Sequence, residues 1–195
     1  MSIRCRMVCV TPMTPKDDNS LDRERWEAAA LDALERGGLG AVAVEPLARE
    51  LGVTKGSFYW HFKTRADLIA ATVARWERLH VDGPLEHLAA VEDPRERLLA
   101  LLAAAGNKPP SIFIRMLDAV DEPVVAAAVA RAAEARVAFA ATAFRELGLS
   151  RARARRQAVL VYSAYVGQAH LSRDAPEVLG DPRALSRHIT EQLIP

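Results

Sequence analysis

The sequence predicts an all-α protein of about nine helices. Residues that favour helices, chiefly Ala, Leu, Arg and Glu, dominate the chain, whereas β-branched residues are few. No segment alternates cleanly between apolar and polar residues, as a half-buried strand does. Hydrophobic residues make up 50% of the 195 positions, so the chain can bury a core in one or two domains.

Residues 1–20 contain prolines and polar side chains without a helical period, so we expect a flexible N-terminal arm there. The arm holds both cysteines, Cys5 and Cys9, whose spacing is weak evidence for a metal site. We therefore expect no metal and no disulfide framework. Arg4 and Arg6 leave two alternatives open, an arm that enters the minor groove of DNA and a loose tail, which is the simpler one.

The first helix is expected to begin near Ser20 or Asp22 and to end at the Gly37–Gly38 pair, with Trp26 in the core. Residues 44–65, VEPLARELGVTKGSFYWHFKTR, then predict two short helices joined by a tight turn.

The turn between these two short helices is defined by its glycine. The first short helix covers about 44–51, and Pro46 lies in its first turn, where a missing N–H costs little. Gly52 ends this helix in a left-handed conformation. Thr54 is expected to cap the next helix, its hydroxyl accepting a hydrogen bond from an N–H of the first turn.

The second short helix, over about 55–61, carries an unusual density of aromatic and polar donors. Phe58 and Phe62 are four residues apart and can face inward together, which leaves the other side chains outside. A positive helix start and these donors suit phosphates and base edges. The pattern predicts a helix-turn-helix DNA reader. The residues expected at DNA are Thr54, Lys55, Gly56, Ser57, Tyr59, Trp60, His61 and Lys63.

These residues resemble the DNA-binding domain of the TetR family of transcriptional regulators. The matching features are the Leu47–Ala48 pair, the run LGVTKG, the block FYWHF and the Lys63 that follows it. The resemblance covers about residues 23–72, a quarter of the chain, and its combined pattern is specific. One departure is Ala43, which stands where the family commonly has a Thr that caps the first motif helix and contacts a phosphate.

A fourth helix is expected from Thr64, which forms a capping box with Asp67, to about His80. In the resembled family this helix links the DNA-binding domain to the rest of the molecule. We interpret Gly83–Pro84 as a break in the chain and as the domain boundary. The predicted domains are a DNA-binding domain with its linker helix, 21–82, and a C-terminal effector-binding and dimerisation domain, 83–195.

The C-terminal part predicts five helices, over about 94–105, from Ser111, over 123–147, over 150–170 and over 181–194. The resemblance implies that the last two pair subunits. The 150–170 helix is apolar nearly all round, which also favours burial in a homodimer. Two-fold pairing would place two recognition helices roughly 34 Å apart, on a palindromic double-stranded DNA operator.

A small-molecule effector is the remaining expectation for the C-terminal part. Its pocket needs apolar bulk with a few polar tips. The candidate residues are Trp76, Phe113, Met116, Leu117, Phe139, Tyr162 and Tyr165. The competing interpretation for each is a core residue at helical spacing, although buried Tyr hydroxyls need a partner.

Composition and motifs narrow the function further. The formal net charge is +1, so overall charge does not point to nucleic acid, and Lys55, Lys63 and Arg65 are the local cluster of cations. We expect a cytoplasmic protein, because the sequence shows no signal peptide and no membrane-spanning run. No catalytic or phosphate-binding motif is present, so we expect neither an enzyme nor a cofactor.

Two functions remain. The first is a repressor that a small molecule releases from its operator, through coupling along the fourth helix. The alternative is a DNA-binding regulator without a small-molecule effector, which acts constitutively or through a protein partner.

Overall fold

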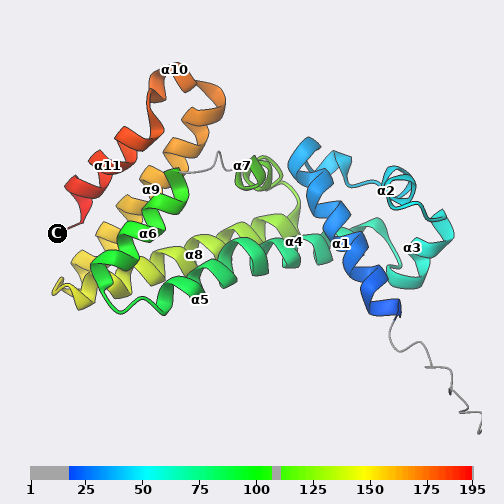
Figure 1. Ribbon diagram of the computed structural model, residues 1–195, viewed down its shortest axis with the longest axis horizontal. Helices are drawn as coiled ribbons and strands as arrows, with labels where there is room; N and C mark the ends of the chain where they lie inside the picture. Colours follow the sequence, from blue (N-terminus) through cyan, green and yellow to red (C-terminus); the bar gives the residue numbers. More distant parts are fainter. Residues whose placement is uncertain (1–17, 107–110, 195) are drawn as a thin grey trace, which may run out of the picture.

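The computed structural model describes residues 18–106 and 111–194, and these residues form helices and no strand (Figure 1). The predicted all-α fold is confirmed. If the continuous helix over 65–89 is counted once and the 3-10 turn is left out, the described residues form ten helices, one more than expected.

The N-terminal end consists of three helices around a small core. Helix α1 spans Asp18–Gly37, a 3-10 turn covers Leu39–Ala41, α2 spans Val44–Leu51 and α3 spans Lys55–His61. Residues 18–20 of the expected arm therefore belong to α1, whereas residues 1–17, with both cysteines, lie outside the described residues.

Helix α4 (Arg65–Glu77) begins at the predicted capping box. The Thr64 Oγ1 accepts a hydrogen bond from the Asp67 N–H at 3.1 Å, and the Asp67 carboxylate accepts one from the Thr64 N–H at 2.9 Å. Both N–H groups would otherwise lack partners at the start of the helix, so this reciprocal pair fixes where α4 begins.

The expected break at Gly83–Pro84 is wrong. A π-helical turn, η2 (Arg78–Asp82), continues α4 directly into α5 (Gly83–Ala89). Gly83 has ordinary helical angles, and its N–H donates to the Arg78 carbonyl five residues back. Pro84 cannot donate to the carbonyl four residues before it, and the wider π turn accommodates that missing bond. The proline is visible in the sequence, but the π turn that accommodates it is not.

The rest of the chain begins with α6 (Pro94–Gly106), α7 (Ser111–Asp118) and α8 (Pro123–Glu146). Helix α9 (Arg151–Asp174) runs four residues beyond the expected end, and the short α10 (Pro176–Leu179) was not expected. Helix α11 (Pro182–Leu193) starts as predicted, because the Asp181 carboxylate accepts from the Arg183 N–H at 2.9 Å.

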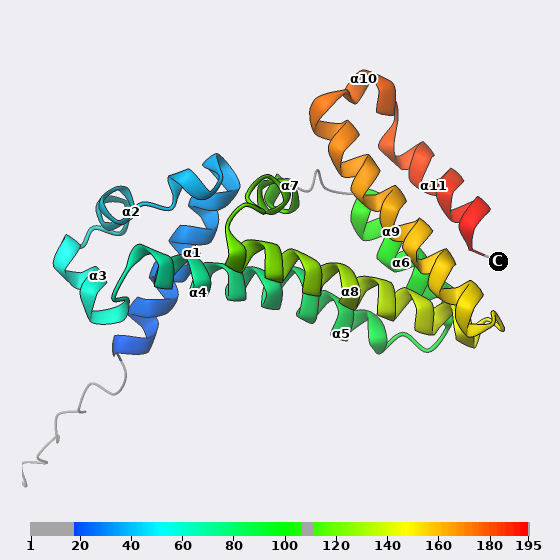
Figure 2. The ribbon, with the colours of Figure 1, turned by 180° about the vertical axis from the view of Figure 1, so that it is seen from behind.

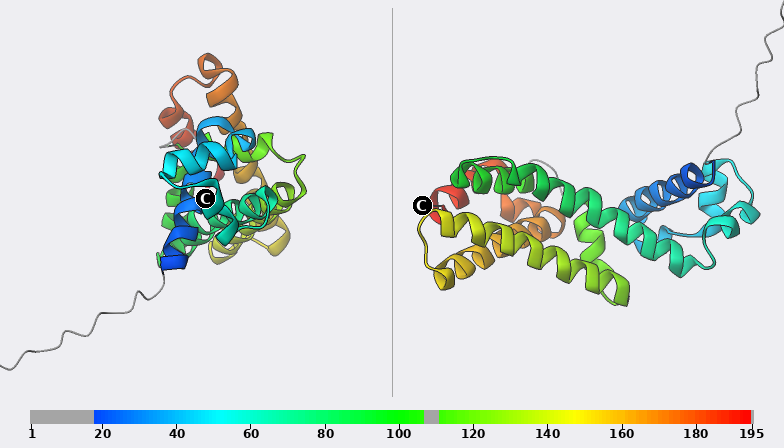
Figure 3. Two further views of the ribbon diagram at one scale, coloured as in Figure 1. Left: turned by 90° about the vertical axis from the view of Figure 1, so that its right-hand side faces the viewer. Right: turned by 90° about the horizontal axis from the view of Figure 1, so that it is seen from below.

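The molecule is elongated, with α1–α3 at one end and α11 near the other (Figures 1 and 2). Helix α8 lies beside the continuous α4–α5 helix along the long axis, as the view from below shows (Figure 3). The second half of α8 packs with α6 and α9, and α11 packs on α6 and α9.

Two hydrophobic clusters form the core. One joins α1–α4 to α7, the first half of α8 and the end of α9, and the other lies among α6, α8, α9 and α11. The first cluster therefore extends across the expected boundary after residue 82. The domain division at this point stays a prediction. Among the described residues, no helix is both long enough and apolar enough to cross a membrane.

Candidate functional site

Helix α3 presents two large aromatic side chains to solvent. Tyr59 is 59% exposed and Trp60 is 83% exposed, whereas Phe58 and Phe62 on the opposite side are buried. Burying such rings is worth about 1.5–3 kcal/mol each, so large aromatics exposed side by side indicate a contact surface.

The buried side of α3 fixes its position. The Phe58 ring meets the Trp26 ring edge-on, with centroids 5.4 Å apart, and stacks on the Phe62 ring at 5.5 Å. The predicted inward pair, Phe58 and Phe62, is confirmed, as is Trp26 in the core. Arg23 of α1 lies 4.4 Å from the Phe62 centroid and donates from Nη1 to the His61 carbonyl at 2.9 Å. A cation at this carbonyl suits the negative end of a helix dipole.

The turn before α3 is left-handed, as predicted. Gly52 has φ 69° and ψ 26°, and the Val53 N–H donates to the Ala48 carbonyl at 3.0 Å, as in a Schellman motif. Ala43 gives α2 no side-chain cap, which agrees with the departure from the family pattern.

The expected hydroxyl cap at Thr54 is wrong. The Thr54 side chain makes no capping hydrogen bond; its backbone carbonyl accepts from the Ser57 N–H at 3.0 Å and closes the first turn of α3. The Thr54 backbone is extended, as at most N-caps. Thr54 is therefore the N-cap residue, as predicted, although its hydroxyl does not make the capping hydrogen bond.

Two of the three cations around α3 have partners within the chain. The Lys55 Nζ lies 2.8 Å from the Glu45 carboxylate, and their hydrogen bond and attraction raise the pKa of Lys55 and lower that of Glu45. Arg65 donates from Nε to the Val42 carbonyl at 2.6 Å and also binds the Leu39 carbonyl, so it holds the 3-10 turn against α4. Lys63 is exposed and pairs with no described residue.

All eight residues expected at DNA lie on or beside α3. Seven are exposed or half-buried side chains, and Gly56 is an exposed glycine at the helix start. Whether these residues touch DNA stays a prediction.

Three of the seven expected effector residues meet between α7 and α9. The Phe113 and Tyr165 rings stack with centroids 5.1 Å apart, and the Tyr162 centroid lies 6.1 Å from that of Tyr165. Burial raises the pKa of both Tyr162 and Tyr165, against the opposing charge of Arg136, so both phenols stay protonated at neutral pH and can donate hydrogen bonds.

Sequence reasoning missed Arg136 of α8. Its guanidinium carbon lies 5.4 Å from the Phe113 centroid and 5.7 Å from the Tyr165 centroid. A signal was present in the sequence, since Arg136 lies four residues from both Ala132 and Ala140 and so falls on the buried stripe of α8.

The other expected effector residues are placed differently. Trp76 and Met116 are fully buried in the first core cluster, and Leu117 packs against it. Phe139 is half-buried and belongs to neither core cluster of the described residues. A groove of about 420 Å³ between α4, the π turn and α8 is lined by Glu77 and Arg131, among others, and by none of the seven candidates. Their role in ligand binding stays a prediction.

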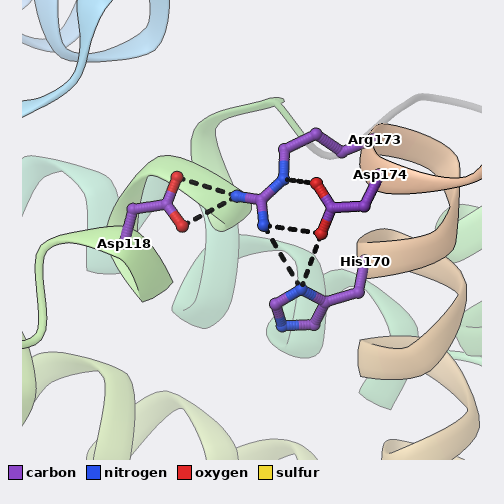
Figure 4. A network of polar contacts seen from close by, with 4 residues as sticks. All are labelled: Asp118, His170, Arg173 and Asp174. Carbon is purple, nitrogen blue, oxygen red and sulfur yellow. Dashed lines mark hydrogen bonds and ion pairs between the residues drawn. The ribbon is translucent and has the colours of Figure 1, made fainter.

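An ionic network connects α7 to the end of α9 (Figure 4). Arg173 lies between Asp118 of α7, at 2.7 Å, and Asp174, and the His170 ring contacts the Asp174 carboxylate. Hydrogen bonding to Arg173 lowers the pKa of Asp174. Within the described residues, no group of three or more His, Cys, Asp or Glu side chains could hold a metal ion.

A left-handed glycine turn between α2 and α3, with an exposed aromatic and donor-rich α3 on a buried base, is the architecture of a helix-turn-helix DNA-binding domain. Residues 28–72 match the family model for "Bacterial regulatory proteins, tetR family". Over residues 28–72 the chain is therefore similar to the DNA-binding domain of TetR-family regulators.

Two curated proteins that the chain resembles are also regulators of the helix-turn-helix type. Over 101 residues the chain is 35% identical to the HTH-type transcriptional regulator SrpR of Pseudomonas putida, and 35% identical to the uncharacterized HTH-type transcriptional regulator TtgW of the same species. Each alignment covers 52% of this chain, but only 40% of SrpR and 64% of TtgW. The chain thus spans only part of the length of these relatives.

Solved structures share the fold across most of the chain. The reduced form of NemR from E. coli aligns with a TM-score of 0.74 at 19% identity, covering 89% of this chain and 98% of NemR. FadR from Bacillus subtilis, solved in complex with stearoyl-CoA, aligns with a TM-score of 0.64 at 13% identity, covering 88% of this chain and 97% of FadR. At these identities the likeness concerns the fold alone.

Proposed function

We propose that this protein is a repressor that binds a palindromic operator as a homodimer and is released by a small-molecule effector. The observation that carries DNA binding is the face of α3, where Tyr59 and Trp60 stand exposed on a helix fixed from below by buried rings. Because Phe58 and Phe62 hold the helix, its outer donors are pre-positioned, which reduces the entropy lost on binding.

The first experiment is a footprint of the purified protein on the DNA that flanks its own gene. We expect a palindromic footprint that survives excess nonspecific competitor and weakens steeply with salt, because phosphate contacts release counterions. Binding that the competitor removes completely would mean that the flanking DNA holds no operator. A genome-wide selection would then find the target.

Tyr59→Ala is expected to weaken operator binding by about 1–3 kcal/mol while the fold stays intact. The ring is 59% exposed, so its removal takes little from the core. The measurement is a titration at matched salt, with the melting temperature determined alongside. Tyr59→Phe is the matched variant, because it separates the hydroxyl from the ring. Unchanged affinity in Tyr59→Ala would place this residue outside the interface.

The homodimer is supported by one face of α9. Beyond the arginine-rich first turn, exposed residues follow one another at about helical spacing, with the adjacent pair Val159 and Leu160 in the middle. The set that forms this face is Ala152, Arg156, Val159, Leu160, Ser163, Gly167 and His170. Val159 is 44% exposed and Leu160 is 50% exposed in the single chain. We propose that a second copy covers this face, which agrees with the two half-sites of a palindrome.

Leu160→Arg is expected to convert the dimer into a monomer and to lower operator affinity more than tenfold. The substitution would bury an unpaired charge at the subunit contact, which costs about 3–5 kcal/mol. Sedimentation velocity measures the state of association. Val120→Arg is the control, since Val120 is also an exposed apolar residue (43%) but lies outside α9. A Leu160→Arg protein that sediments as the wild type does would exclude this face as the contact.

The effector part of the proposal rests on the cluster of Phe113, Tyr162 and Tyr165, which combines apolar rings with hydroxyl groups. FadR, a protein of the same fold, was solved with stearoyl-CoA, so the fold accommodates a small molecule. An effector releases DNA only if it binds the arrangement that cannot hold DNA more tightly than the one that can. A regulator without an effector is the alternative, and specific binding of a small acid would exclude it.

A further inference from the structure

The two terminal nitrogens of the Arg136 guanidinium differ in their hydrogen bonding. Its Nη2 donates to the His80 carbonyl at 3.0 Å, whereas its Nη1 is buried and has no hydrogen-bond partner among the described residues. No ion pair between described residues involves Arg136. A buried donor left without an acceptor costs about 1–3 kcal/mol, and more when charged. Because the fold keeps this donor unpaired despite the cost, Nη1 is a candidate for binding a ligand.

A second unpaired donor lies in the same region. The Trp76 Nε1 is buried without a partner among the described residues, and Trp76 belongs to the core cluster that also contains Phe113 and contacts Tyr165. The hydroxyls of Tyr162 and Tyr165 can both donate and accept hydrogen bonds, and the Tyr162 hydroxyl interacts with the Arg136 guanidinium. The two buried N–H donors, on Arg136 and Trp76, favour a ligand that accepts hydrogen bonds.

The Nη2 of Arg136 contacts the π turn between α4 and α5, where the helical hydrogen-bond pattern is interrupted. In an α-helix the carbonyl of residue 80 would accept from the N–H of residue 84, but residue 84 is Pro and has no N–H. Arg136 supplies a donor to that carbonyl from α8. It therefore joins the aromatic cluster to the π turn between α4 and α5, and α4 leads directly to the DNA-binding helices.

We propose that the effector is a monocarboxylate with an apolar body, and that its carboxylate binds Arg136 Nη1 while its body lies against the Phe113 and Tyr165 rings. This inference deepens the proposed effector function and rests on it. A carboxylate is the acceptor that matches a guanidinium best, because charge-assisted bonds are about twice as strong as neutral ones. A carboxylate on Nη1 would share the guanidinium with the His80 carbonyl on Nη2, so one side chain would connect the ligand to the π turn.

The test is calorimetric binding to the full-length protein without DNA. The probes are benzoate, phenylacetate and hexanoate, each compared with its neutral amide, which has nearly the same shape. We expect at least one acid to bind at millimolar concentration or below, and its amide to bind more than tenfold more weakly. Arg136→Gln should weaken binding of that acid about 10–100-fold and leave the amide unchanged.

Two further variants keep this test decisive. Arg136→Lys retains a positive charge and should still prefer the acid, which covers the case in which Arg136→Gln folds poorly. Arg131→Gln removes a guanidinium from the same helix, one that pairs with Glu77 instead, and should leave the preference intact. Circular dichroism of each variant checks the fold.

Three outcomes would overturn the inference: no acid binds, acid and amide bind alike, or Arg136→Gln binds the acid as the wild type does. None of these outcomes depends on the operator. A footprint without acid binding would leave the DNA-binding function in place and remove only the anionic effector. Acid binding without a footprint on the flanking DNA would support the effector and leave the operator to be found elsewhere.

Discussion

Phe58→Ala is expected to cost about 3–5 kcal/mol of unfolding free energy, which is a large part of the stability of an ordinary domain. The Phe58 ring is 1% exposed and contacts both Trp26 and Phe62, so its removal leaves a cavity lined by the two other rings. Urea unfolding followed by tryptophan fluorescence and circular dichroism measures the change. Trp26 is in direct contact with the ring, so its fluorescence should report the loss early.

Tyr59→Ala is the matched control for Phe58→Ala, because it removes the adjacent aromatic ring from the same helix. Tyr59 faces solvent, so the two variants should have different effects. Phe58→Ala should mainly lower the stability, whereas Tyr59→Ala should mainly lower the DNA affinity. A loss of less than about 1 kcal/mol in Phe58→Ala would contradict the assignment of this ring to the core.

Gly52→Val is expected to destabilise the protein by about 1–3 kcal/mol and to lower operator affinity through a misplaced α3. Gly52 has φ 69°, where a β-branched residue is a strong outlier. A Cβ added at this position meets nothing within 4 Å, so the penalty comes from the backbone and not from a clash. Thermal melting and the footprint titration together measure both effects.

Gly52→Asn separates backbone strain from the loss of glycine itself. Asn tolerates the left-handed region far better than Val, and the space around Gly52 accepts the side chain. The Asn variant should therefore melt close to the wild type. Equal melting temperatures for the Val variant and the wild type would show that the turn adopts another conformation in solution.

Helix ends that local chemistry determines could be predicted from the sequence. The capping box of Thr64 and Asp67, the left-handed Gly52 and the start at Asp181 all involve residues within a few positions of each other. Such signals need no knowledge of the rest of the fold, and the structure confirms each of them. The buried pair of Phe58 and Phe62 follows from the same local periodicity.

One error is local, the Thr54 hydroxyl that makes no capping hydrogen bond. The errors at Pro84 and Lys55 depend on distant parts of the chain. Pro84 predicts a break, because the sequence does not show that a π turn precedes it or that Arg136, 56 positions away from His80, donates to the exposed carbonyl. Lys55 resembles an unpaired cation, because Glu45 approaches it only when α2 and α3 pack together. Local patterns therefore locate the candidate DNA-binding helix well and the polar contacts of the second site poorly.

The shared core has a consequence for any attempt to join this helix-turn-helix domain to a different C-terminal part. Ile112 and Phe113 of α7 and Val125 of α8 belong to the same cluster as Trp26 and Trp76. A chimera joined after residue 82 would leave behind the apolar surface that covers one side of the reader. An exchange at the end of the first half of α8, with α7 included, keeps more of that surface. The apolar contacts that α9 makes must still come from the new C-terminal part. The unit that can be exchanged is larger than the unit that binds DNA.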